Sequence, residues 1–187
     1  MKSCSIFQRH TARGFTLVEL LIVVIILAIL AAIVVPQFSA TTDDAKAAAA
    51  DSTLSNLRSA IDLYYQQHGV YPGAVTAVPT AACTGTSGAG VATGGAGATA
   101  ATALQEQLSL YTDSNGGACS TSDTTNHKFG PYMKKSTFPP DPFNNVSTIN
   151  VVADGNLNMV ADGTAGGWKY DSKTGKLIIN HTTYQNK

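Results

Sequence analysis

The sequence predicts an α+β protein in which one long N-terminal helix packs on a small C-terminal antiparallel sheet. Residues 15–35 are apolar except for Thr16 and Glu19, and 21 residues can cross a hydrocarbon core of roughly 30 Å. Residues 36–69 continue with apolar side chains at helical spacing. Residues 129–187 contain short apolar and aromatic runs separated by Gly and Pro, which predict strands and turns.

The helix is expected to have a transmembrane half, 15–35, and an amphipathic half, 36–69. Gly69 is a plausible end of the helix. Pro36 removes one intrahelical hydrogen bond, so we expect a helix kink there, either as a break between span and soluble part or as a flexible joint. One stripe of the amphipathic half must cover another element. The stripe consists of Leu54, Leu57, Ile61, Tyr64, Tyr65 and His68.

Residues 70–128 form a Gly/Ala/Thr-rich variable region. Such a composition buries little surface, and only a short helix around 101–111 is expected in it. In 129–187 a strand is expected at 148–152, and a hairpin turns at 171–175. The face expected to pack on the helix stripe carries Trp168, Tyr170, Leu177 and Ile179.

The charges divide unevenly along the chain. It has 12 basic and 12 acidic residues in total, but residues 1–14 contain three basic residues and no acid. Positive charge before a span marks its cytoplasmic side. Without this leader the side chains sum to −3, which argues against a nucleic-acid partner. Lys134-Lys135, the only adjacent basic pair, is expected to lie in a solvated turn.

Glu19 is the residue that a simple membrane anchor would not need. A carboxylate at the centre of a bilayer costs about 2.5–3.5 kcal/mol. A cut between Gly14 and Phe15 would remove the basic leader, keep the apolar helix and create an amine four residues before Glu19. On a helix these positions share a face, so amine and carboxylate could pair within one chain or between neighbours. Alternatively, the anchor stays uncut and Glu19 snorkels to the interface.

The run Gly14-Phe15-Thr16-Leu17-Val18-Glu19-Leu20 resembles the prepilin cleavage and methylation motif of type IV pilins and type II secretion pseudopilins. The resemblance implies a pilin-like fold, cleavage after Gly14 by a membrane-embedded prepilin peptidase, and N-methylation of Phe15. It also implies assembly into a helical filament through Glu19, on an inner-membrane platform. Pro36 falls where many members carry a helix-loosening proline. The C-terminal Pro-Pro-Asp-Pro-Phe and Gly-Gly-Trp-Lys-Tyr-Asp runs resemble major pseudopilins more loosely, because Phe143 stands where that group often has Trp.

Two cysteines remain after the leader is removed, Cys83 and Cys119. An even number in an oxidising compartment indicates one disulfide, which on the chain-entropy model would stabilise the fold by roughly 3–4 kcal/mol for a loop of about 35 residues. Zinc is disfavoured because the chain has no CxxC spacing or His cluster. A thiol nucleophile would need a base such as His127.

No metal ligands are assigned. Asp154, Asn156, Asn158 and Asp162 offer oxygens in a Gly-rich stretch, and some secretion pseudopilins bind calcium in C-terminal loops. The EF-hand pattern is absent, and Asx turns commonly produce such clusters. Calcium therefore stays a possible cofactor, and no other cofactor is expected.

The sequence favours a structural filament protein over an enzyme, because no catalytic constellation can be assembled from it. The filament would be a pilus or a secretion pseudopilus, its subunits starting as single-pass inner-membrane precursors and ending in the periplasm or at the cell surface. The alternative is a membrane-anchored periplasmic binding module that does not polymerise. The N-terminus distinguishes them: methylated Phe15 for the filament subunit, intact Met1 for the module.

Overall fold

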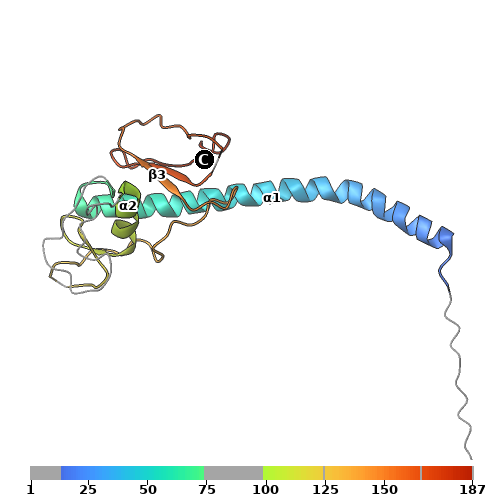
Figure 1. Cartoon of the computed structure of the whole chain (residues 1–187), viewed down its shortest axis with the longest axis horizontal. Helices are drawn as coiled ribbons and strands as arrows, with labels where there is room; N and C mark the ends of the chain where they lie inside the picture. The colour runs from blue at the N-terminus through green and yellow to red at the C-terminus, as the bar shows by residue number, and fades with distance from the viewer. Residues whose placement is uncertain (1–13, 74–98, 124, 165, 187) are drawn as a thin grey trace, which may run out of the picture. The chain divides into compact units, whose positions relative to one another are not determined.

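The computed structural model describes residues 14–73, 99–123, 125–164 and 166–186; the side chains of residues 39 and 40 are outside this description. The chain divides into two compact units, residues 1–44 and 45–187. The predicted α+β class is confirmed: one long helix is followed by a short helix and small sheets (Figure 1).

The long helix α1 spans Leu17–His68, within two residues of the predicted range at its start and one at its end. Gly69 terminates it, since its N–H still donates to the carbonyl of Tyr65 at 2.8 Å while its φ of 70° leaves the helical region. Gly is the residue that reaches this backbone conformation without steric cost. The predicted C-terminal end of the helix is therefore correct and has a local cause.

Residues 70–128 contain the predicted short helix, α2, at Ala100–Ser109. Thr99 caps it by accepting a hydrogen bond from the N–H of Thr102 at 3.2 Å. Strands β1 (Tyr111–Thr112) and β2 (Ala118–Cys119) follow as an antiparallel pair. Most of the Gly/Ala/Thr-rich run, residues 74–98, lies outside the described residues.

The C-terminal sheet consists of β3 (Ile149–Val152), β4 (Trp168–Asp171) and β5 (Leu177–Ile179) in the order β3-β4-β5. The hairpin prediction is confirmed, because β4 and β5 pair antiparallel with Tyr170 opposite Leu177. The sheet is mixed, however, because β3 pairs parallel to β4. A long connection returns the chain to the end of the sheet at which β3 begins, so that β4 can run parallel to β3. A hairpin turn could not make this connection.

Gly167 marks the entry into β4. Its φ is 80°, and a Cβ at this position would lie 2.5 Å from the carbonyl oxygen of Thr148. Close passage of two backbones therefore requires glycine here. The residue after it, Trp168, then donates its backbone N–H to the same carbonyl at 2.8 Å.

The core of the second unit forms where α1 meets the sheet, as the side-chain pattern predicts. The four predicted sheet residues are all buried, and so is most of the helix stripe. The exceptions are His68, which is partly buried, and Tyr65, which is 42% exposed and stacks on Tyr71 at 4.3 Å between ring centroids. Ile178 is buried as well, on the other face of β5. The core cluster comprises Ala50, Leu54, Leu57, Ile61, Tyr64, Leu104, Leu108, Phe138, Trp168, Tyr170, Leu177 and Ile179.

Candidate functional site

Thr16 and Glu19 form a reciprocal cap at the start of α1. The Glu19 carboxylate accepts the backbone N–H of Thr16 at 2.9 Å and its hydroxyl at 2.7 Å. In return, the N–H of Glu19 donates to the Thr16 hydroxyl oxygen at 3.2 Å. This is the capping-box arrangement, which satisfies donors that the first helical turn leaves unpaired. Within one chain, Glu19 thus has a local partner that the sequence prediction did not include.

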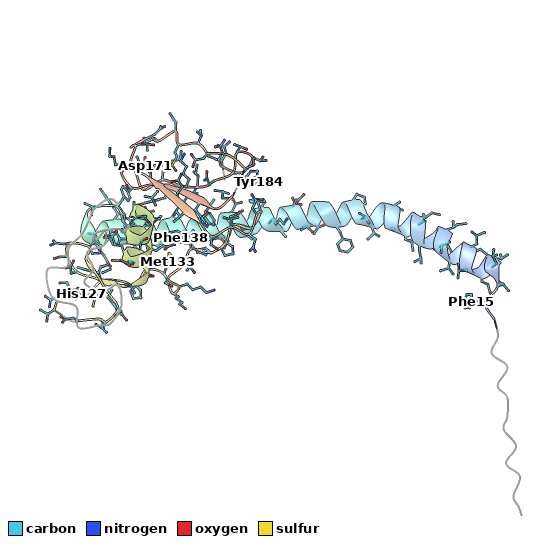
Figure 2. The ribbon with its side chains drawn as sticks, in the orientation of Figure 1. Phe15, His127, Met133, Phe138, Asp171 and Tyr184 are labelled. Carbon is cyan, nitrogen blue, oxygen red and sulfur yellow. The ribbon has the colours of Figure 1, made fainter. Side chains whose placement is uncertain are left out.

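Phe15 precedes the first helical residue, Leu17, and is 78% exposed. It lies at the N-terminal end of the described chain (Figure 2). The expected sharing of a helix face by Phe15 and Glu19 is therefore not what the structure has, because Thr16 is the cap and Phe15 lies outside the helix. Phe15 and Glu19 are still only four residues apart in the sequence.

Gly14 lies in open space. It has no helical or strand structure, and a Cβ built on it would meet nothing within 4 Å. The packing of the described residues therefore does not require glycine at this position.

Among the described residues, the first 19 residues of α1 are not covered by other parts of the chain. Every large apolar side chain from Phe15 to Val35 is between 42% and 82% exposed. By length and composition, α1 is the helix among the described residues that could cross a membrane. Burying each such side chain is worth about 1.5–3 kcal/mol, so this surface needs a lipid or protein environment. The helical assignment continues through Pro36, and a kink at this residue stays a prediction.

Of the two cysteines in the predicted Cys83–Cys119 disulfide, only Cys119 lies among the described residues. Cys119 is buried in β2, and its sulfur lies 3.4 Å from the Thr121 hydroxyl. Cys83 lies outside the described residues, as do the leader and its Cys4. The pairing therefore stays a prediction.

Two of the four residues considered for calcium, Asn156 and Asp162, are engaged in other side-chain contacts. Asn156 accepts the N–H of Asn158 at 2.8 Å, which is an Asx turn, and donates its own N–H to Asp171 at 2.9 Å. Asp162 forms an ion pair with Lys169 and accepts a hydrogen bond from Asn150. Among the described residues, no three His, Cys, Asp or Glu side chains gather as a metal site.

Asp141 is a structural residue that sequence reasoning missed. Its carboxylate is fully buried and accepts four backbone N–H groups at 2.9–3.1 Å. Burial acts to raise the pKa of Asp141, but these four hydrogen bonds outweigh it and lower the pKa below its ordinary value. The carboxylate thus ties the turn after it to the entry of β4. The donors are Phe143, Asn144, Val146 and Gly167.

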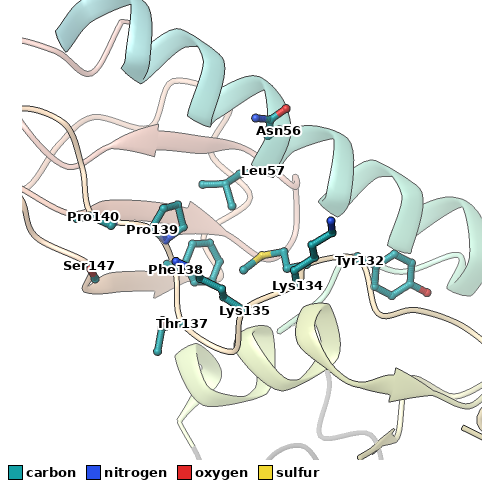
Figure 3. Close-up of a pocket in the computed structure, with 11 residues that line it drawn as sticks. Asn56, Leu57, Tyr132, Lys134, Lys135, Thr137, Phe138, Pro139, Pro140 and Ser147 are labelled. Atoms are coloured by element: carbon teal, nitrogen blue, oxygen red, sulfur yellow. The ribbon is translucent and has the colours of Figure 1, made fainter.

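A groove of about 680 Å³ opens in the second unit between α1 and the segment 132–140. Figure 3 shows Leu57 reaching from α1 toward Phe138 and Pro139, with Lys134 and Lys135 on the same segment. Both lysines are exposed, as the expected solvated turn requires. The groove therefore combines an apolar lining with two ammonium groups at its rim.

Comparison with known protein families matches residues 9–35 to the prokaryotic N-terminal methylation motif. The match covers the candidate cut at Gly14, the exposed Phe15, the capped Glu19 and the apolar part of α1. Neither the search of curated proteins nor the search of solved structures returned a match to this chain. The chain carries the prepilin-type signal that type IV pilins and pseudopilins share, a signal of structural precursors that a prepilin peptidase processes.

Proposed function

We propose that this chain is a structural subunit of a type IV pilus or type II secretion pseudopilus. It is processed by prepilin peptidase after Gly14, N-methylated on Phe15 and polymerised through α1. The precursor sits in the inner membrane with its leader in the cytoplasm, and the assembled subunit lies in the periplasm or at the cell surface. Its principal partner is a second copy of itself.

One observation carries this proposal: the motif match coincides with a helix half whose large apolar side chains are all exposed in the described part of the chain. A helix that served only as a membrane anchor would need the same apolar length, but it would not need Glu19. Copies of α1 packed side by side would cover the exposed surface from Phe15 to Val35. They would also bring the terminal amine of one subunit to the carboxylate of the next.

The cap at Thr16 gives the pairing step a definite starting state. Before assembly the Glu19 carboxylate accepts two hydrogen bonds from Thr16, which offsets part of its cost in an apolar environment. A carboxylate has about four lone-pair sites, so it has capacity left for the amine of a neighbouring Phe15. In the filament, this charged partner would stabilise Glu19 more than a hydroxyl does.

The experiment combines N-terminal mass spectrometry with two substitutions. The wild-type chain should start at methylated Phe15, and sheared filaments should contain it. Glu19→Ala should be cleaved as wild type but give background levels of filament, because the counter-ion of the amine is gone. Thr16→Ala is the matched control, since it removes the capping hydroxyl and keeps the carboxylate, and it should still assemble.

An intact Met1 on the membrane-purified protein would overturn the proposal and leave a membrane-anchored binding module. Wild-type filament yield from Glu19→Ala would refute the pairing role alone. If Thr16→Ala loses filaments as completely as Glu19→Ala, the carboxylate serves to cap the helix and does not pair with a neighbour.

A further inference from the structure

The negative charge of the processed chain is concentrated in its first unit. From Gly14 to Asp44 the charged residues are Glu19, Asp43 and Asp44, with no Lys, Arg or His. Residues 45–187 contain nine acidic and nine basic residues. The net charge of −3 therefore belongs to residues 14–44, which include the apolar stretch that the proposed function places among neighbouring copies. Parallel helices that carried this charge without cations would repel one another.

Asp43 and Asp44 lie on α1 beyond the apolar stretch, and both are exposed. Their carboxylates have no ion-pair or hydrogen-bond partner among the described residues. Two adjacent unpaired carboxylates next to the apolar stretch form a defined negative point on the helix. Lys46 follows them on the same helix, but no ion pair joins it to either carboxylate among the described residues.

Lys134 and Lys135 form the complementary feature on the second unit. Both side chains are exposed and lack an ion-pair or hydrogen-bond partner among the described residues. By contrast, Lys169 pairs with Asp162, and Lys128 lies 5.3 Å from the centre of the Phe129 ring. The adjacent lysines are thus a basic pair whose charge nothing described in the same chain uses.

The lysine pair also borders the groove in Figure 3. Met133, Pro139 and Pro140 supply its accessible apolar lining above the buried Leu57 and Phe138, and Lys134 and Lys135 stand beside them. Apolar contact next to fixed charges is the arrangement of an interface, in which the charges set partner and register while the apolar surface supplies area. A helix that carries an apolar stretch at residues 15–35 and two carboxylates at Asp43 and Asp44 offers both kinds of contact.

Resting on the proposed function, we infer that Lys134 and Lys135 receive Asp43 and Asp44 of a neighbouring copy, whose helix lies along the groove. The contact is heterologous, because an acidic patch on the first unit of one copy meets a basic patch on the second unit of another. Such contacts propagate into open helical assemblies. This pairing is separate from the one at Glu19 and uses different residues on both sides.

The experiment is a reciprocal charge reversal in the full-length chain, with processed monomer and sheared filament quantified together. K134E/K135E and D43K/D44K should each lower filament yield at least about tenfold while leaving processing unchanged, because like charges then face each other. Combining all four substitutions should restore filaments. K128E/K173E is the matched control: it makes the same charge change at two other exposed lysines and should assemble as wild type.

A second measurement localises the contact. Filaments co-assembled from Asp43→Cys and Lys134→Cys chains should give a cross-linked dimer on oxidation, and Asp43→Cys with Lys173→Cys should not. Wild-type filament yield from K134E/K135E overturns the contact and leaves the filament function intact. Failure of the variant with all four substitutions to form filaments also overturns the contact. If K134E/K135E lowers filament yield but D43K/D44K does not, the contact is likewise overturned, and the lysines are assigned to another anion such as a lipid headgroup. Absence of wild-type filaments overturns both proposals.

Discussion

The two ends of α1 differ in what their apolar side chains touch. From Phe15 to Val35 each large apolar side chain is exposed, whereas Leu54, Ile61 and Tyr64 are at most 1% exposed. The second unit thus supplies its own apolar partners, whereas the apolar side chains of the first stay exposed among the residues that the structure describes. The C-terminal part of α1 therefore stabilises the fold of the second unit, whereas the N-terminal part needs lipid or another protein to cover it.

Ile61→Ala against Ile26→Ala is the most direct test of the contrast. Ile61 is completely buried and Ile26 is 52% exposed. Removing the Ile61 side chain should lower the free energy of unfolding of the second unit by about 2–5 kcal/mol, whereas Ile26→Ala should leave it unchanged. The measurement is denaturant unfolding of the full-length chain in detergent, followed by fluorescence of Trp168, the only tryptophan, which is fully buried. Equal effects of the two substitutions would contradict the division.

Asp141→Asn sharpens the comparison by testing how the second unit is held together without a partner. The amide can accept fewer of the four N–H groups, so stability at pH 7 should fall by about 1–3 kcal/mol. Because the folded pKa is lowered, the wild-type contribution is present above the unfolded pKa of about 3.9 and is lost as pH falls through the folded value. The gap between variant and wild type should therefore narrow on acidification.

The control for Asp141 is Asp154→Asn, at an exposed position, for which no comparable loss is expected. Unfolding at pH 7 and in acid, again reported by Trp168, checks both variants. A gap that is constant across this pH range would show that shape, and not the carboxylate charge, is what Asp141 contributes.

Gly175→Ala against Gly69→Ala gives the smallest expected difference. Both glycines have positive φ, 72° and 70°, but a Cβ at Gly175 would overlap the Tyr71 ring whereas one at Gly69 meets nothing within 4 Å. Gly69→Ala should cost about 1–2 kcal/mol from backbone strain alone, and Gly175→Ala should cost more by the displacement of Tyr71. Differential unfolding curves of the two variants measure this difference. Equal losses would mean that the ring moves aside freely.

Elements with strong periodicity could be predicted from the sequence. The three- and four-residue spacing of Leu54, Leu57 and Ile61 predicted α1 and its buried face, and Gly69 predicted its end. The Trp168 and Leu177 strands were recognisable as a hairpin because a short Gly-ended turn joins them. The motif residues Gly14, Phe15 and Glu19 were recognised through their resemblance to the prepilin pattern, and the match to residues 9–35 confirms the signal.

Features that depend on long-range geometry could not be predicted. The parallel pairing of β3 with β4 depends on the path of a 15-residue connection, whose sequence does not state where it returns. The role of Asp141 depends on Gly167, 26 residues away. Tyr65 fits the helical stripe by spacing, yet Tyr71 provides it with a stacking partner at the surface. The Thr16 cap did have a sequence signal, since Thr followed by Glu three residues later is a capping-box pattern.

The position of the Thr16 cap has a consequence for proteolysis. Because α1 starts at Leu17, the bond between Gly14 and Phe15 lies in non-helical, exposed backbone. Proteases cleave exposed segments with few local contacts most readily, so a processing enzyme would reach this bond without unwinding a single helical turn. After cleavage, the new N-terminus would be a short non-helical segment. The first turn of α1 would already be capped before the leader is removed.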